Sequence, residues 1–165
     1  MANKLGENMK VRYCYFGLID SQDDETLIDK LRFIHETISR YSDKYQICGV
    51  FYYANQSFFH CLEGKKETVH KLLSYLHASG KLIDIKVYQN VSIENPHYQT
   101  WSMKYVHKES DIINFFNKIG HQLFCPLLLN DKNIEKLVNI IFSEISNESI
   151  NKLAKGYKNR GKSFY

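Results

Sequence analysis

A histidine in the middle of an otherwise apolar strand is the residue whose type and setting could do chemistry. His60 lies in residues 47–64, where two runs rich in aromatic and β-branched side chains flank a polar turn and predict a β-hairpin. Side chains of a strand alternate between its two faces, so His60 shares a face with Phe58 and Leu62. A neutral imidazole offers one hydrogen-bond donor and one acceptor, and its pKa lies near neutrality. His60 is therefore a candidate ligand partner, a candidate proton-switch group, or a buried histidine bonded to a neighbouring side chain.

Other kinds of site find little support in the residues. Cys61 follows His60 directly and points to the opposite face of the strand, so the two cannot act as a base and a nucleophilic thiol. The seven histidines and four cysteines show no HxxxH or CxxC grouping that would indicate a metal site. The sequence has no glycine-rich phosphate loop and no RNP pattern of an RNA-binding domain. We therefore expect no metal, no catalytic residue and no enzyme activity.

The elements that must position His60 follow from the hydrophobic pattern. Residues 11–18 form a β-prone run with Tyr13 and Tyr15 on one face. Apolar residues at spacings of three and four predict helices over residues 25–41 and 66–77, the first preceded by capping side chains at 21–25. Alternation at residues 83–88 predicts another strand. This order of strands and helices predicts a ferredoxin-like α+β fold, an antiparallel sheet with both helices on one face.

The C-terminal part of the chain is predicted to cover the second face of this sheet. Residues 98–105, which contain the single tryptophan, indicate an extra short strand. Helical spacing then predicts one helix near residues 112–119, another near 134–145, and a short third helix from Asn147. These helices are too few to build a confident core of their own. We expect them to pack on the face that the first two helices leave open.

Composition indicates an ordinary globular chain. Of its 165 residues, 44% are hydrophobic and 24% are charged, and the net charge is +4. No apolar run approaches the ~18 residues of a membrane span, and the N-terminus lacks a signal-peptide pattern, so we expect a cytoplasmic protein without membrane contact. The four cysteines have no paired spacing and are expected to be reduced. The basic residues near the C-terminus are expected to be solvated rather than bound to nucleic acid.

Residues 10–105 resemble the BLUF family of flavin-binding blue-light sensors. The resemblance rests on four segments in the family's order: Tyr15 at the end of the first strand, Ile47-x-Gly49-x-x-x-Tyr53, Phe58-Phe59-x-x-Leu62-Glu63-Gly64, and Trp101-Ser102-Met103. It implies the ferredoxin-like fold and a flavin held between the two helices. The implied cofactor is FAD, with FMN or no cofactor as the alternatives.

The resemblance also implies residue roles, and this chain departs from the family at the switch. In the family, a strand glutamine bonds both the flavin and a tyrosine, and light-driven electron and proton transfer from the tyrosine rearranges that glutamine. Tyr15 matches the tyrosine, but His60 stands in place of the glutamine, and Ser42 stands in place of an asparagine that binds the flavin carbonyl. An imidazole cannot reproduce the amide's hydrogen-bonding pattern, so we expect ordinary photoswitching to be altered or lost. The implied cofactor-binding residues are Tyr15, Ile34, Tyr41, Ser42, His60, Leu76 and Lys81, and the implied signal-transmitting residues are Trp101 and Met103.

Two main hypotheses follow, and a small enzyme or a nucleic-acid binder is a third, weaker one that salt-dependent binding to oligonucleotides would favour. The first is a BLUF-type sensory protein with a flexible N-terminus (1–9), a BLUF-like domain (10–105), a helical cap (106–156) and a basic tail (157–165), which signals through an unidentified protein partner and self-association. The rival is a cofactor-free, BLUF-derived interaction or scaffold protein. A purely hydrophobic groove between the helices, filled by Phe33, Leu76 or Tyr41, would favour the rival. The sharpest expectation is a contact between Tyr15 and His60, since side chains on neighbouring strands lie ~4.5 to 8 Å apart.

Overall fold

A tight hairpin lies at the centre of the fold. Its strands, β2 (Cys48–Ala54) and β3 (Ser57–Lys65), are joined by Asn55 and Gln56, whose φ angles are 51° and 62°. Two successive residues with positive φ form the turn whose twist matches that of the flanking strands, and asparagine tolerates this region. The predicted hairpin is confirmed. β3 is buried from Ser57 to Gly64, because other layers cover both of its faces.

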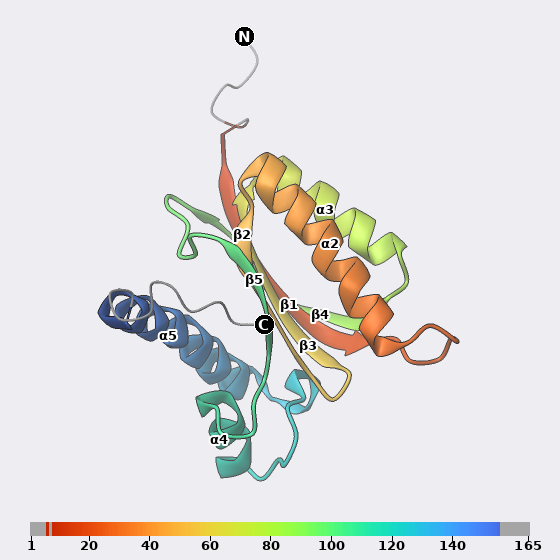
Figure 1. Ribbon diagram of the computed structural model, residues 1–165, viewed down its shortest axis with the longest axis vertical. Helices are drawn as coiled ribbons and strands as arrows, with labels where there is room; N and C mark the ends of the chain where they lie inside the picture. The colour runs from red at the N-terminus through yellow and green to blue at the C-terminus, as the bar shows by residue number, and fades with distance from the viewer. Residues whose placement is uncertain (1–5, 7, 156–165) are drawn as a thin grey trace.

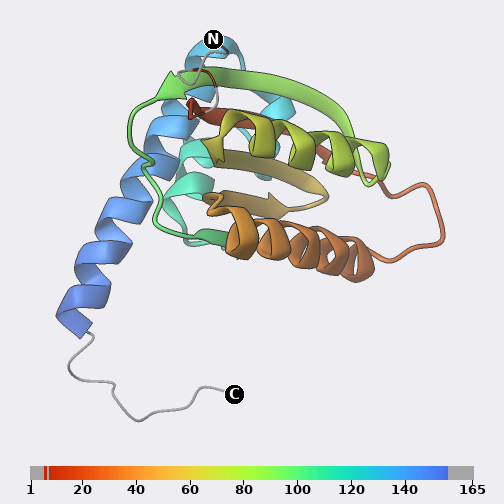
Figure 2. The same ribbon diagram turned by 90° about the horizontal axis from the view of Figure 1, so that it is seen from above.

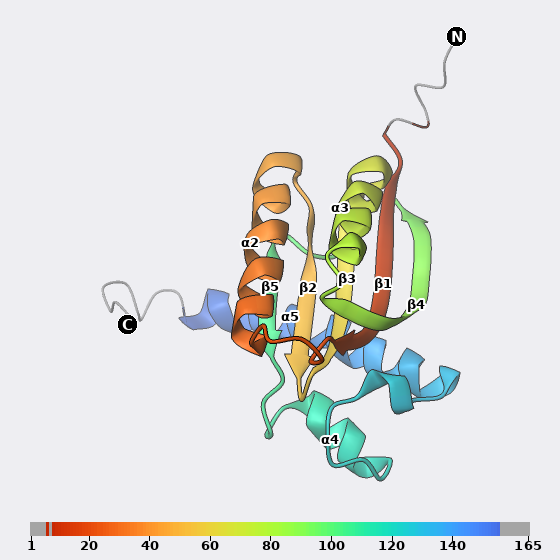
Figure 3. The same ribbon diagram turned by 90° about the vertical axis from the view of Figure 1, so that its right-hand side faces the viewer.

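The hairpin belongs to a five-stranded sheet in the order β4-β1-β3-β2-β5 (Figure 3). The other strands are β1 (Lys10–Ile19), β4 (Leu82–Ile93) and β5 (Trp101–Tyr105). All neighbours are antiparallel except β5, which runs parallel to β2. The predicted ferredoxin-like α+β fold with an extra short strand is confirmed.

This computed structural model describes residue 6 and residues 8–155, with side chains as far as Glu144. The predicted basic tail lies outside the described residues. So does the predicted flexible N-terminus, apart from residues 6, 8 and 9.

Helices cover both faces of the sheet, as Figures 1 and 2 show. One face carries α2 (Leu27–Tyr45) and α3 (Lys66–Ala78), while the other carries α4 (Asp111–Lys118), the short 3₁₀ turn η1 (Pro126–Leu128) and α5 (Asp131–Lys155). Each face has its own core, and alternate residues of β1 and β3 enter one core or the other. None of the helices in the described part of the chain is long and apolar enough to cross a membrane.

Several predicted element bounds need correction. α2 begins at Leu27 because Thr26, not the earlier polar run, provides the cap: its hydroxyl accepts a hydrogen bond of 3.1 Å from the Asp29 amide. The same helix reaches Tyr45 instead of ending at Tyr41. β5 begins at Trp101 rather than at residue 98, because the amide of Tyr98 donates to the Glu63 carboxylate instead of to a strand. The predicted third helix from Asn147 is wrong, since α5 runs without a break to Lys155.

Candidate cofactor site

Tyr15 and His60 form a buried hydrogen-bonded pair beneath α2 and α3. The two residues lie directly opposite each other in the register of β1 and β3. The Tyr15 hydroxyl oxygen lies 2.7 Å from His60 Nδ1, and neither side chain is exposed to solvent. The predicted contact between them is confirmed.

Trp101 determines which nitrogen of His60 carries the proton. Its indole Nε1 donates to His60 Nε2 at 3.2 Å, and an indole can only donate. Burial lowers the pKa of His60 to about 3, so the ring is neutral and has a single N–H group. Because Nε2 must accept from Trp101, the proton lies on Nδ1, which donates to the Tyr15 oxygen.

This arrangement leaves the Tyr15 proton without an acceptor among the described residues. The hydroxyl has one hydrogen-bond partner there, His60 Nδ1, and that nitrogen acts as the donor. Burial, and secondarily the nearby Tyr13, raise the pKa of Tyr15, so the hydroxyl keeps its proton. Tyr15 therefore presents an unused O–H donor in a buried position, where an unpaired donor is costly.

A buried hydroxyl without a hydrogen-bond partner among the described residues lies on α2. Thr37 is 2% exposed, and its Oγ1 has no hydrogen-bond partner in the described part of the chain. It lines a groove of about 270 Å³ between α2 and α3, together with Arg40, Tyr41, Lys44, Tyr45 and Tyr75. The Tyr15 hydroxyl, which has a proton to donate, and the unpaired Thr37 hydroxyl fit a ligand with hydrogen-bonding polar atoms, such as a flavin ring.

The space between the helices is nevertheless narrow. Ile34 and Leu76, both predicted to contact the cofactor, are fully buried in the core that α2 and α3 share with the sheet. Phe33 and Tyr75 stack across the two helices with ring centroids 6.1 Å apart. Pockets for drug-sized ligands span ~300 to 1,000 Å³, so the groove is smaller than a typical site. A flavin ring would require these apolar side chains to move apart.

The remaining predicted site residues lie around the edges of this region. Tyr41 lines the groove between the helices. Ser42 does not, because its hydroxyl donates to the Ile47 carbonyl at 2.5 Å and lines a hollow shared with Trp101, at the end of α2 beside β5. Lys81 Nζ lies 2.7 Å from the Glu25 carboxylate and 4.8 Å from the centre of the Phe33 ring. The structure therefore joins Tyr15, His60 and Trp101 directly, and leaves Ser42 and Lys81 outside that group.

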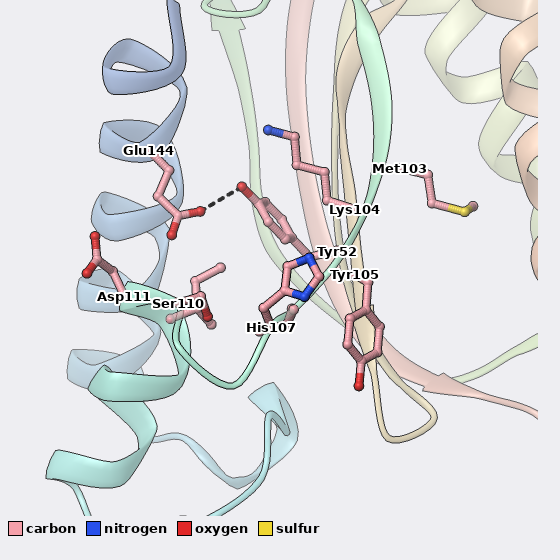
Figure 4. Close-up of a pocket in the computed structure, with 10 residues that line it drawn as sticks. Tyr52, Met103, Lys104, Tyr105, His107, Ser110, Asp111 and Glu144 are labelled. Carbon is pink, nitrogen blue, oxygen red and sulfur yellow. Dashed lines mark hydrogen bonds between the residues drawn. The ribbon is translucent and has the colours of Figure 1, made fainter. Parts of the chain in front are cut away.

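A larger hollow lies on the opposite face of the sheet. Its volume is about 530 Å³, and it lies between the end of β5 and the helices α4 and α5, where the Tyr52 hydroxyl donates to Glu144 Oε2 at 3.0 Å (Figure 4). Of the predicted site residues, Met103 alone lines it, and Figure 4 shows the Met103 side chain pointing away from Glu144. Met103 packs instead against the core beneath α2 and α3.

Two features of the site were not predicted from the sequence: the buried Thr37 hydroxyl and the hydrogen bond from Trp101 to His60. Thr37 follows Ile34 by three residues, so helical spacing already placed it on the buried face, where a hydroxyl needs a partner. No pattern in the sequence indicates the hydrogen bond from Trp101 to His60. It depends on β5 pairing in parallel with β2, with Trp101 opposite Gly49, and hydrophobic alternation does not specify that register.

Comparison with known proteins agrees with the fold. Residues 11–104, more than half of the chain, match the family model BLUF, described as sensors of blue-light using FAD. A structure of BlsA in its photo-activated state is 36% identical with a TM-score of 0.66, over 81% of this chain and 95% of that one. The BlsA ground state gives 35% identity and a TM-score of 0.67, over 81% and 88% of the two chains. The dark-state structure of the BLUF protein BlrB, 16% identical over 84% and 98% of the chains with a TM-score of 0.62, shows a shared fold. No curated protein matches the chain.

Proposed function

The chain belongs to the BLUF family of flavin-based blue-light sensors, and from this premise we propose that it binds a flavin between α2 and α3 and responds to light with an altered switch. FAD is the proposed cofactor, in line with the family description, with FMN as the alternative. The observation that supports the proposal is the buried chain of hydrogen bonds from Trp101 through His60 to Tyr15. This chain ends in a hydroxyl with a proton to donate.

The residues of this chain would hold and orient the cofactor as follows. The proton of the Tyr15 hydroxyl and the unpaired hydroxyl of Thr37 offer hydrogen bonds, and Tyr41 and Tyr75 offer aromatic surface at the groove. Arg40 and Lys44 at the same groove offer positive charge to a phosphate group. A bound flavin supplies a blue-light-absorbing ring that can accept an electron and a proton. Tyr15 is the residue placed to give up a proton, because its hydroxyl has no acceptor among the described residues.

The altered switch follows from the difference between an imidazole and an amide. A glutamine can rotate and exchange its donor and acceptor ends while staying in place. Both nitrogens of His60 are already engaged, one by Tyr15 and one by Trp101. Rotation of the ring would put carbon atoms in place of the nitrogens and break both bonds. We therefore propose that the ordinary rearrangement does not occur with His60.

The rival function is a cofactor-free interaction protein. The full burial of Leu76 and the stacking of Phe33 on Tyr75 favour it, because these side chains occupy the place where the ring would lie. The hydroxyl of Thr37, unpaired among the described residues, argues against it, because most buried polar groups of native proteins are hydrogen-bonded.

An absorption spectrum of the purified protein, taken after incubation with excess FAD and desalting, tests the proposal. Retained flavin absorbance is expected, with no ordinary reversible red shift after blue light. A colourless protein would overturn flavin binding and leave the cofactor-free scaffold. A reversible red shift in the unmodified protein would show that His60 supports the ordinary switch and would contradict the altered one.

The variant His60→Gln supplies the matched control, because it restores the amide of the family. It is expected to retain flavin and to gain the light-induced red shift, while the double variant His60→Gln/Tyr15→Phe retains flavin and lacks the shift. If His60→Gln binds flavin and still shows no shift, the histidine is not the cause of the altered response.

We also propose that the output is a protein contact rather than an enzymatic reaction. β4 lies at an edge of the sheet (Figure 3), and two valines on it are partly exposed, Val87 at 48% and Val91 at 38%. Exposed apolar residues on an edge strand favour pairing with another chain, either a second copy or a partner protein. Light scattering coupled to size-exclusion chromatography, in the dark and under blue light, should show a species larger than the 19.5 kDa monomer.

A further inference from the structure

A buried carboxylate with an unusually full set of partners lies three residues beyond His60 on β3. Glu63 is fully buried, and its carboxylate lies 2.9 Å from Arg12 Nη2 and 3.0 Å from Arg12 Nε. It also accepts hydrogen bonds from two successive backbone amides, those of His97 at 2.9 and 3.1 Å and of Tyr98 at 2.9 Å. A buried charge persists only when it is paired and hydrogen-bonded in this way.

Glu63 and His60 hold the same segment of chain from opposite faces of the sheet. His60 points toward α2 and α3 and accepts from Trp101 at the start of β5. Glu63 has the opposite parity on β3, so it points to the other face, where it binds the connection that leads into β5. Residues 97–101 are therefore attached to β3 at two places: the amides of residues 97 and 98 bind Glu63, and the Trp101 indole binds His60.

The same connection contacts α5. His97 Nε2 lies 3.2 Å from the carbonyl oxygen of Phe142, and the two rings are 5.1 Å apart. The Arg12 guanidinium lies 5.0 Å from the centre of the Phe142 ring, and the Tyr98 ring lies 6.0 Å from it. Figure 2 shows the connection between β4 and β5 passing beside α5. Phe142 thus touches both partners of Glu63, the arginine and the connection.

We propose that Glu63 is a positioning residue that couples the Trp101 end of β5 to α5. Its carboxylate binds both the Arg12 guanidinium and the amides of residues 97 and 98, so these groups form one hydrogen-bonded unit. The Phe142 ring packs against that unit. The amides of His97 and Tyr98 are held by Glu63, so the connection cannot absorb a displacement of Trp101 by moving alone. The displacement therefore also shifts the side chains of His97 and Arg12, against which Phe142 packs. As a route for a light signal this inference rests on the proposed function, whereas the coupling itself belongs to the protein chain and can be measured without flavin.

The single tryptophan of the chain allows a direct test of this coupling. Phe142→Leu removes the ring on α5 that rests on the unit, and acrylamide quenching of Trp101 fluorescence reports the environment of β5. In flavin-free protein in the dark, Phe142→Leu is expected to change the quenching of Trp101. In a Glu63→Gln background the same substitution is expected to cause no further change, because the connection between the two sites is already loose.

Hydrogen exchange provides the second readout. Glu63→Gln removes the charge that holds the amides of His97 and Tyr98, so exchange in residues 94–100 should become at least about tenfold faster, and exchange in residues 131–144 should rise with it. Arg12→Met is the second variant, since it leaves the carboxylate in place and removes its cation. Asp29→Asn is the control, because it breaks an exposed ion pair with Arg32 at 3.4 Å and should change neither segment.

The outcomes separate the coupling from a merely structural role. If the effects of Phe142→Leu and Glu63→Gln on Trp101 quenching simply add, Glu63 stabilises the fold without coupling the two sites, and the proposal is overturned. If Glu63→Gln does not fold, the cycle is made with Arg12→Met, and additivity there overturns the proposal equally. Failure of flavin binding would overturn the proposed function and leave this result unchanged.

Discussion

One imidazole joins three strands of the sheet at the residue scale. His60 on β3 bonds Tyr15 on β1 through Nδ1 and Trp101 on β5 through Nε2. Because the indole of Trp101 can only donate, His60 Nε2 must accept and the imidazole proton lies on Nδ1. Nδ1 then donates to the Tyr15 oxygen, so the Tyr15 hydroxyl proton is left without an acceptor among the described residues. The position is thus occupied by a residue whose two ring nitrogens are both engaged, one by Tyr15 and one by Trp101.

The neutral state of His60 predicts how the stability of the protein depends on pH. Its pKa is about 3 in the folded protein and about 6.5 in an unfolded chain, so below pH 6.5 the unfolded state binds a proton that the folded state does not. The free energy of unfolding should therefore fall as the pH falls from 6.5 toward 3, by up to about 1.4 kcal/mol per pH unit from this residue.

Urea denaturation at several pH values, compared between the protein and His60→Gln, isolates this contribution. Taking the difference between the two plots of unfolding free energy against pH cancels the contribution of the carboxylates, which titrate in the same range in both proteins. Equal slopes for the protein and His60→Gln would show that His60 is not held neutral by burial.

The pairing of β2 with its neighbours depends on one glycine at the element scale. Gly49 has a φ of 144°, and a Cβ placed on it would lie 1.9 Å from the carbonyl oxygen of Cys61 on β3. On its other side, the Gly49 amide donates to the Thr100 carbonyl at 3.1 Å, next to Trp101. Close approach of the backbone at Gly49 thus brings β3 and β5 near enough for Trp101 to reach His60.

Gly49→Ala is expected to lower the free energy of unfolding by at least about 2 to 3 kcal/mol, because the methyl group meets backbone that cannot move aside. Gly80→Ala is the matched comparison. Gly80 also has a positive φ, 70°, but a Cβ there meets nothing within 4 Å, so strain alone should cost about 1 to 2 kcal/mol. Chemical denaturation measures both. Equal losses for the two variants would contradict the clash at Gly49.

The same elements show how far the sequence determines the site. Strand alternation placed Tyr15 and His60 on one face, and the order of elements put β1 beside β3, so their contact was predictable. Strand alternation also placed Glu63 on a buried face, where its charge needs a partner, but the alternation does not identify that partner. Its partners came from a connection without periodic sequence, and Ser42 was placed by a helix that ends four residues later than predicted. Local pattern specifies faces, whereas partners across loops depend on tertiary packing.

The sheet of the whole molecule is buried on both faces, and the helical cap shares a core with it. Cys14, Phe59 and Cys61 of the central strands pack in one cluster with Leu137 of α5 and Phe116 of α4. Trp101 lies on the other face, against the core of α2 and α3. Since β1 and β3 contribute side chains to both cores, neither face can lose its cover without exposing the strands that organise the other.

This shared sheet predicts that the cap and the BLUF domain unfold together. Leu137 is fully buried, so Leu137→Ala should lower the free energy of unfolding by about 2 to 5 kcal/mol, while Leu128→Ala, at a leucine that is 60% exposed, should change it little. The measurement is urea denaturation followed by Trp101 fluorescence, which reports the far face, and by far-ultraviolet circular dichroism. One transition, seen equally by both probes and displaced equally by Leu137→Ala, is expected. If circular dichroism detects an early transition that Trp101 does not, and Leu137→Ala displaces that transition alone, the cap is a separate unit and its motions need not reach the tyrosine and histidine beneath α2 and α3.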